Sequence, residues 1–250
     1  MAFFPYIKAS LRKNKYYLDD RYAIDDGNDH PFVVLLPGGG YSIIYSYGEG
    51  DPIAKELNNK GISAFILYYR VKKKAHYPNP LDDCASAIKH ILDNAQNYHV
   101  MKDNYSLWGA SAGGHLAASM GTDHVGCNIY NLPYPKSLVL IYPVITFVKE
   151  YHRGSRRLFL GRKVCDECVY KYSVENHVHD KYPETFIWCG DHDKSVPCSN
   201  SVLMSNALKE KNIRYELKIY PNIGHGVGLA KGTTAESWFN DAVKFCFGIE

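Results

Sequence analysis

Short apolar runs alternate along the chain with longer segments in which apolar residues recur every three to four positions. The short runs are rich in β-branched and aromatic residues and are bounded by glycine, proline or polar residues, a pattern typical of buried strands. The predicted strands are residues 32–36, 63–68, 105–108, 138–141 and 186–189. A further run, residues 215–220, alternates less regularly and is predicted to lie nearer a sheet edge.

The intervening segments have helical spacing, most clearly in Pro80–Gln96, where apolar side chains fall on one face. The other predicted helices are residues 51–59, 112–120, 199–211 and 235–247. Alternating strands and helices predict an α/β fold with a mostly parallel central sheet and helices on both faces. Residues 12–27 predict a weak hairpin before this sheet, with strands at Tyr16–Leu18 and Tyr22–Ile24. No internal repeat or low-complexity linker interrupts residues 1–250, which predicts a single domain.

The segment 146–183 breaks the alternation. It contains Arg153, Arg156 and Arg157, several tyrosines and a pair of cysteines. Because so long a connection within a compact domain usually serves function, this segment is predicted to be a small lid or pocket wall.

The sequence Gly109-Ala110-Ser111-Ala112-Gly113 fits the G-x-S-x-G pattern of a nucleophile elbow. A predicted strand runs directly into it and a predicted helix runs directly out, which is the context that the motif requires. The turn is so sharp that side chains two positions from the serine would collide, and glycine stands at both positions. Ser111 is therefore the candidate nucleophile, with the Ala112 N–H at the start of the helix as one oxyanion donor.

Three consecutive glycines follow the first long strand, in Pro37-Gly38-Gly39-Gly40-Tyr41. In hydrolases with such an elbow, the loop after this strand supplies the second oxyanion donor. A phosphate-binding loop is the competing interpretation, but the Lys-Ser/Thr ending of a P-loop is missing. Gly39 and Gly40 are both candidate donors, and the sequence does not choose between them. Tyr41 is expected to contact the substrate because it directly follows the glycines.

Hydrolases with this elbow carry an acid and then a histidine after the serine in the chain. Asp191 and Asp193 both follow the predicted strand 186–189. Asp191 is so close to the strand that a turn or capping role is natural, so Asp193 is favoured. His225 follows the last predicted strand, between two glycines, and is the candidate base. We therefore predict a Ser111–His225–Asp193 triad that forms an acyl-enzyme intermediate.

The chain resembles the acetyl-esterase and acetylxylan-esterase-like (BD-FAE-like) serine hydrolases of the α/β-hydrolase fold. The resemblance rests on the motifs above together with Glu49-Gly50, Gly114-His115-Leu116, Tyr142-Pro143-Val144 and Gly224-His225-Gly226. It implies an α/β-hydrolase fold, Asp193 as the acid, and hydrolysis of short acyl esters, often acetyl groups on sugars. Pro37 stands where lipase-type loops have histidine, which suggests a different wall around the acyl group.

Two other functions remain open at this point. An arylformamidase-like amidase would use the same triad, because amide and ester cleavage share the oxyanion chemistry. A ligand-binding protein on a hydrolase scaffold is the other alternative, although proteins of that kind often lack a triad member. The expected partner is a small ester, plausibly an acetylated sugar, and the sequence does not indicate an oligomeric state.

Composition narrows the remaining classes of protein to which the chain could belong. A formal charge of +3, with basic and acidic residues interspersed, lacks the electrostatic footprint of a nucleic-acid binder. No apolar stretch is long enough to span a membrane, and residues 1–15 lack the apolar core of a secretory signal, so a cytoplasmic location is expected.

The seven cysteines are irregularly spaced and suggest reduced thiols. Cys165 and Cys168 have metal-ligand spacing, but no second pair completes a set, so neither metal nor cofactor is expected.

Overall fold

The computed structural model describes residues 16–249; residues 1–15 and 250, including the start of the predicted hairpin, lie outside that description. The described chain contains a seven-stranded sheet in the order β1-β3-β2-β4-β5-β6-β7. The strands are β1 Tyr17–Tyr22, β2 His30–Leu36, β3 Ser63–Tyr68, β4 Val100–Ala110, β5 Ser137–Ile141, β6 Glu184–Gly190 and β7 Tyr215–Tyr220. Strands β2 to β7 pair in parallel, as the alternation with helices predicts. Strand β7 lies at the sheet edge, as its irregular pattern indicates.

The predicted N-terminal hairpin is wrong within the described residues. A single strand, β1, pairs antiparallel with β3, with Tyr17 opposite Tyr68. Beyond β1 the chain does not turn back on itself, since the Ile24 N–H donates to the Ser63 hydroxyl at 3.0 Å. The open edge of β3 offers β1 backbone partners, with one register shift between Asp19 and Tyr22, and a surface on which Leu18 is buried. A local sequence pattern cannot indicate that edge, which forms only when the sheet assembles.

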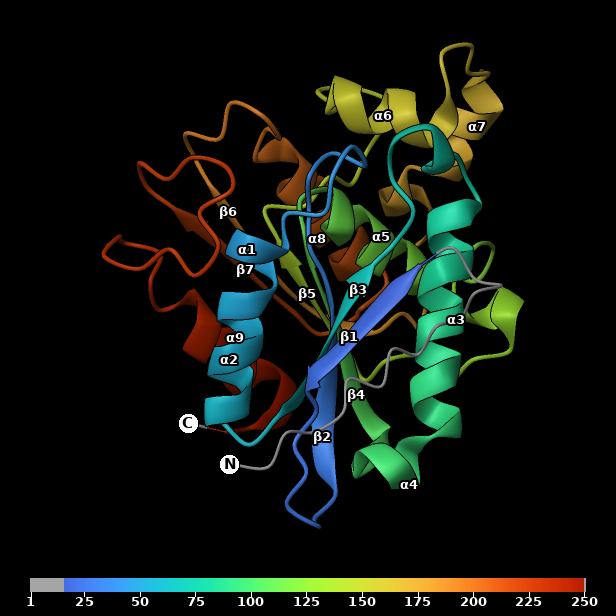
Figure 1. Cartoon of the computed structure of the whole chain (residues 1–250). Coiled ribbons are helices and arrows are strands. Elements are labelled where there is room, and N and C mark those ends of the chain that lie inside the picture. Colours follow the sequence, from blue (N-terminus) through green and yellow to red (C-terminus); the bar gives the residue numbers. More distant parts are fainter. Residues whose placement is uncertain (1–15, 250) are drawn as a thin grey trace.

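Helices cover both faces of the sheet (Figure 1). One face packs against α2 (Asp51–Asn59) and α9 (Trp238–Phe247), which bury aromatic and aliphatic side chains there. The other face packs against α3 (Asn79–Asp93), α5 (Ala112–Met120) and α8 (Ser199–Glu210). These layers cover both faces of the strands and explain why the strand sequences are nearly continuous apolar runs.

Three predicted helices differ from those observed at their ends, α8 only by ending at Glu210. The segment predicted as one helix at Pro80–Gln96 divides at Asn94 into α3 and the short α4 (Ala95–Tyr98). The Asn94 side-chain amide donates to the His90 carbonyl at 2.8 Å, competing with continued helix formation. Helix α9 begins at Trp238, three residues after the predicted start.

The segment 146–183 folds into short helices beyond the carboxyl ends of the strands (Figure 1). They are α6 (Arg153–Leu160), α7 (Asp166–Lys171) and the 3-10 helix η3 (Val174–His177). Phe159 of α6 is fully buried and stacks on Tyr41, with 4.9 Å between ring centroids. This packing holds the insertion over the edge of the sheet where Ser111 lies.

Two of the seven cysteines form a disulfide, contrary to the expectation that all are reduced thiols. Cys189, at the end of β6, forms a disulfide with Cys198, which immediately precedes α8. Their Cα atoms are 5.8 Å apart, although nine positions separate them in sequence. Sequence spacing does not indicate this proximity, because it arises when the loop 191–197 returns to the strand end. The cysteines without a disulfide in the described chain are Cys84, Cys127, Cys165, Cys168 and Cys246. Among residues 16–249, no helix combines the length and apolar character needed to cross a membrane.

Candidate active site

Ser111 occupies the turn between β4 and α5, where the backbone takes the strained conformation expected of an elbow. Its φ is 52° and its ψ is −117°. The Ser111 N–H donates to the Ile141 carbonyl at 2.9 Å, and its own carbonyl accepts from Val144 N–H at 3.0 Å. A β-carbon on Gly113 would collide with the carbonyl oxygen of Leu36, so α5 can approach β2 only with glycine there. The neighbouring strands thus hold the serine in position.

Ser111, His225 and Asp193 form a continuous chain of hydrogen bonds. Ser111 Oγ lies 2.8 Å from His225 Nε2, and His225 Nδ1 lies 2.5 Å from Asp193 Oδ2. The other carboxylate oxygen of Asp193 accepts from the Ser195 and Val196 N–H groups, each at 2.9 Å. Because an ionised carboxylate can only accept, the Nδ1 atom donates to Asp193, and Nε2 is left to accept the serine proton. The three residues predicted from chain order therefore lie together.

Asp191, the competing acid, lies outside this chain of hydrogen bonds. Its side chain is exposed, and Oδ1 accepts from the Asn222 N–H at 2.7 Å. The Asp193 side chain, by contrast, is completely buried beneath the imidazole. Asp191 thus stabilises the turn after β7 by a hydrogen bond, which is the kind of turn role that its position directly after β6 suggests.

The glycine loop after β2 borders the same pocket. Gly39 and Gly40 have φ values of 119° and 63°, a region that favours glycine. The Gly39 carbonyl accepts from Ser42 and Ile43, which curls the loop over the elbow. The Gly38 N–H donates to Glu49 Oε2 at 2.7 Å and is therefore already engaged. Gly39 and Gly40 line the pocket, whereas Ala112 is the first residue of α5, where an N–H has no intrahelical acceptor.

A buried carboxylate beneath this loop was not assigned a role from sequence. Glu49, at the end of α1 (Ser46–Glu49), is only 4% exposed. Its Oε1 accepts from the Tyr142 hydroxyl at 2.8 Å, and that hydroxyl accepts from the Gly228 N–H at 3.0 Å. Burial raises the pKa of Glu49, while the bonds from Tyr142 and Gly38 and the nearby charge of His225 oppose the shift. Its motif, Glu49-Gly50, carried part of the resemblance but did not indicate this bridge.

The pocket above Ser111 has a volume of 480 Å³, in the range of small-molecule sites. The glycine loop, the loop after β6, the His225 loop and the insertion all contribute to its walls. Its apolar wall includes Ile43, Tyr45 and Leu158, and its polar wall includes His152 and Ser195.

His152, at the start of the insertion, also lines the pocket, and the sequence did not indicate a role for it. Its Nδ1 accepts from the Ser155 N–H at 3.1 Å, which caps α6. In the neutral ring the proton is therefore on Nε2. Burial lowers the pKa of His152, and the neighbouring His225 lowers it further, while Asp193 opposes the shift. The insertion thus brings a neutral hydrogen-bond donor to the pocket.

Tyr41 is not at the pocket surface, contrary to the expectation that it contacts substrate. Its side chain is fully buried, and its hydroxyl lies 2.8 Å from His115 Nδ1. The reason is its positive φ of 60°, which turns the ring inward from the glycine loop toward α5. Tyr41 instead packs between the sheet and the insertion.

The described residues contain no group of three or more His, Cys, Asp or Glu side chains placed to hold a metal ion. Cys165 caps α7 by accepting from the Cys168 N–H, and the two sulfur atoms are 3.0 Å apart. His177, further along the insertion, lies against His124, with 3.8 Å between the ring centroids, and does not join the two cysteines in a ligand set.

The parallel sheet, the elbow and the insertion together define the α/β-hydrolase fold. The family model described as BD-FAE matches residues 20–208, and the chain belongs to that family. A solved structure of an acetyl ester-xyloside bifunctional hydrolase from Caldicellulosiruptor lactoaceticus is 33% identical. It superposes with a TM-score of 0.85 over 92% of this chain and 86% of that one.

Two curated relatives are also similar. Endo-1,4-beta-xylanase B of Butyrivibrio fibrisolvens is 33% identical over 87% of this chain, which spans 35% of that protein. The acetylxylan esterase of Xylanibacter ruminicola is 28% identical over 83% of this chain, which spans 42% of that protein. The chain thus spans less than half the length of these relatives.

Proposed function

We propose that this chain is a carboxylester hydrolase that removes short acyl groups, in particular acetyl, through Ser111, His225 and Asp193. The observation that carries the proposal is the unbroken hydrogen-bond chain from the Ser111 hydroxyl to the buried Asp193 carboxylate. The strained elbow and the adjacent pocket support it, as does membership of the BD-FAE family.

In the acylation step, His225 Nε2 takes the proton of Ser111 Oγ as that oxygen attacks the ester carbonyl carbon. Asp193 keeps the Nδ1 proton in place and stabilises the imidazolium that forms. The negative charge moves to the carbonyl oxygen, where the Ala112 N–H and the Gly39 or Gly40 N–H donate to it. Each such donor is worth about 3 kcal/mol in the transition state. Collapse of the intermediate expels the alcohol, which takes the proton from His225.

Deacylation repeats these steps with water as the nucleophile. His225 removes a proton from water as its oxygen attacks the acyl-serine carbonyl, and the same N–H groups stabilise the oxyanion. Collapse breaks the bond to Ser111 Oγ, which regains its proton from His225. The carboxylic acid is released and the enzyme returns to its starting state.

The proposed alcohol half of the substrate is a sugar or a xylo-oligosaccharide. The names of two relatives, an acetylxylan esterase and an acetyl ester-xyloside hydrolase, support this choice. The neutral His152 donor in the pocket wall also suits a hydroxyl-rich alcohol.

The proposal is tested by acyl release from aryl acetate, butyrate and octanoate, acetylated xylo-oligosaccharides and N-formylkynurenine, with Ser111→Ala as the matched control. We expect acetate release by the native chain, a loss of at least about a thousandfold in Ser111→Ala, and preference for acetyl over octanoyl. Deformylation in preference to ester cleavage would favour the arylformamidase-like alternative. Equal inactivity of both proteins on every compound would contradict hydrolysis and favour a binding scaffold.

A further inference from the structure

A series of cavities extends from the catalytic pocket across the insertion. The pocket at Ser111 shares His152, Gly154 and Ser195 with a neighbouring cavity of 590 Å³. That middle cavity shares Tyr151 and Arg153 with an outer cavity of 630 Å³. Since each neighbouring pair has residues in common, a ligand larger than one sugar can continue from the ester toward the outer cavity.

The outer cavity is strongly basic. Its lining, among residues 16–249, contains four arginines, Arg153, Arg156, Arg157 and Arg162, and no carboxylate. The middle cavity adds Lys194, and its one acidic side chain, Glu150, accepts a hydrogen bond from the Ser199 hydroxyl. In the part of the chain that the structure describes, the ion-paired arginines are Arg21, Arg70 and Arg214, so those of the outer cavity have no carboxylate partner. Their charges are available to an anion from outside.

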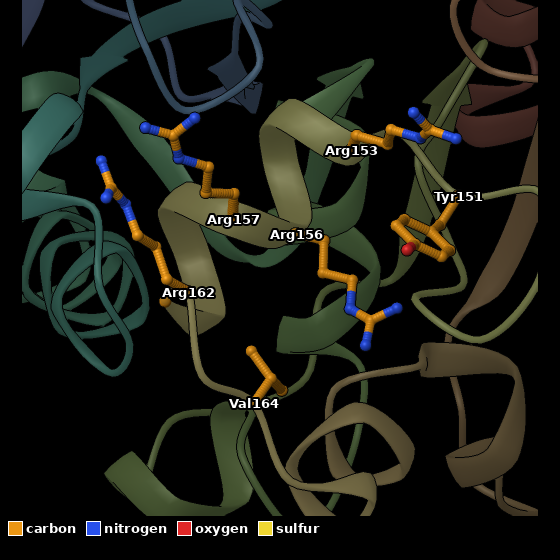
Figure 2. Close-up of a pocket in the computed structure, with 7 residues that line it drawn as sticks. Tyr151, Arg153, Arg156, Arg157, Arg162 and Val164 are labelled. Atoms are coloured by element: carbon orange, nitrogen blue, oxygen red, sulfur yellow. The ribbon is translucent and has the colours of Figure 1, made fainter.

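The positions of these arginines also disfavour a role in stabilising the helix. Arg153 is the first residue of α6 and Arg156 lies in its first turn, where the helix dipole is unfavourable to positive charge. The Arg156 guanidinium lies 4.4 Å from the centre of the Tyr151 ring. Figure 2 shows Arg156 extending toward Tyr151, while Arg157 and Arg162 point together to the opposite side of the helix. Arg153 and Arg156 are therefore the pair nearest the middle cavity.

We propose that the outer cavity binds a carboxylate carried by the alcohol half of the substrate, so that the preferred substrates are acetylated oligosaccharides bearing a uronic acid. This inference rests on the proposed function, which places an acetylated sugar at Ser111. A guanidinium matches a carboxylate with two parallel N–H···O bonds, and a uronate is the carboxylate form of a sugar. The Arg156 guanidinium packs over the Tyr151 ring, which holds this cation beside the middle cavity.

The test compares acetylated xylo-oligosaccharides of one backbone length, with and without a glucuronic acid branch. The variant Arg153→Gln/Arg156→Gln removes two charges from the cavity. The control Lys209→Gln/Lys211→Gln removes two charges from exposed positions at the carboxyl end of α8. Because α8 leads into the start of β7, these lysines lie at the amino ends of the strands, whereas Ser111 lies at the carboxyl ends. Aryl acetate hydrolysis reports separately on the catalytic machinery.

For the acidic oligosaccharide we expect kcat/KM to fall about tenfold in the arginine variant, mainly through KM, and to stay within about twofold in the lysine control. Aryl acetate hydrolysis should be unchanged, and kcat/KM for the neutral oligosaccharide should fall much less than for the acidic one. The preference for the acidic substrate should weaken at high ionic strength. Equal use of acidic and neutral oligosaccharides by all three proteins, with aryl acetate hydrolysis intact, would overturn this inference and leave the proposed function standing.

A binding measurement separates the two proposals if aryl acetate is not hydrolysed. Calorimetry with the deacetylated, glucuronic acid-bearing oligosaccharide requires no catalysis. Tighter binding to the native chain than to Arg153→Gln/Arg156→Gln would support the carboxylate site. Equal binding to both, or none, would overturn it.

Discussion

The hydroxyl of Tyr142 donates a hydrogen bond of 2.8 Å to the buried carboxylate of Glu49. The same carboxylate accepts from Gly38 in the glycine loop, and the same hydroxyl accepts from Gly228, three residues after His225. This bridge therefore joins the loop of the candidate oxyanion donors to the loop of the candidate base. We infer that Glu49 is a positioning residue, which holds both loops at Ser111 without contacting the reacting atoms.

Glu49→Gln is expected to lower kcat by about tenfold to a hundredfold, with a smaller change in KM. A glutamine cannot accept hydrogen bonds from both Gly38 and Tyr142, because one end of its amide is a donor. The misplaced loop then stabilises the oxyanion less well. Aryl acetate kinetics measure the effect, and Tyr142→Phe, which leaves the Gly38 bond intact, should lose less. A Glu49→Gln enzyme with native kcat would argue against the bridge.

Asp193→Asn is expected to reduce kcat by about three to four orders of magnitude, because an amide can hold the imidazole in the wrong tautomer. Asp191→Asn is the matched control, since it makes the same change two positions away, outside the hydrogen-bond chain. It should retain nearly all activity. Steady-state kinetics of both variants decide the assignment, and a larger loss in Asp191→Asn would reverse it.

Chain order and strand-to-loop transitions were sufficient to predict which loops carry the triad to Ser111. The carboxyl ends of parallel strands share one sheet edge, so side chains that follow β4, β6 and β7 must lie near one another. Side-chain packing does not enter into this prediction, which brings the loops of Asp193 and His225 together although the two residues are 32 positions apart in the chain. The choice of Asp193 over Asp191 rested in addition on the turn role expected next to a strand and on the family resemblance.

Contacts that depend on packing could not be predicted in the same way. Tyr41 adjoins the glycine loop in sequence, but its inward backbone conformation places the ring against His115 and Phe159. His152 reaches the pocket only because the insertion folds over the sheet. Likewise, the partner of β1 is an edge that exists only in the assembled sheet.

Tyr41→Phe is expected to lower the free energy of unfolding by about 1–2 kcal/mol, because a buried acceptor on His115 loses its donor. The kinetics on acetyl esters should be unchanged, since the ring is fully buried. Urea unfolding and aryl acetate hydrolysis provide the two readouts. An increase in KM without a loss of stability would restore Tyr41 as a substrate contact.

Stability should fall below neutral pH because of His115. Burial lowers its pKa from 6.5 to about 4, against the opposing effect of the Tyr172 carbonyl. As the pH falls, the unfolded chain therefore takes up a proton at this histidine before the folded chain does. The free energy of unfolding decreases by roughly 3 kcal/mol between about pH 6.5 and pH 4. At higher pH both states are neutral at this residue, and the contribution is constant.

His115→Gln removes this titration while retaining hydrogen-bonding capacity. Urea unfolding of the variant should show a smaller loss of stability between neutral pH and pH 4 than the native chain shows. Parallel pH profiles for the two proteins would mean that His115 does not contribute to acid sensitivity.

The most direct test of the proposed chemistry is covalent labelling of the nucleophile. A fluorophosphonate ester reacts with a serine that is activated by a neighbouring histidine, and the tagged peptide can be identified by mass spectrometry. We expect one stable adduct on Ser111, with labelling greatly slowed in His225→Gln. An unlabelled native protein, or an adduct on a different serine, would contradict the assignment of Ser111 as the nucleophile.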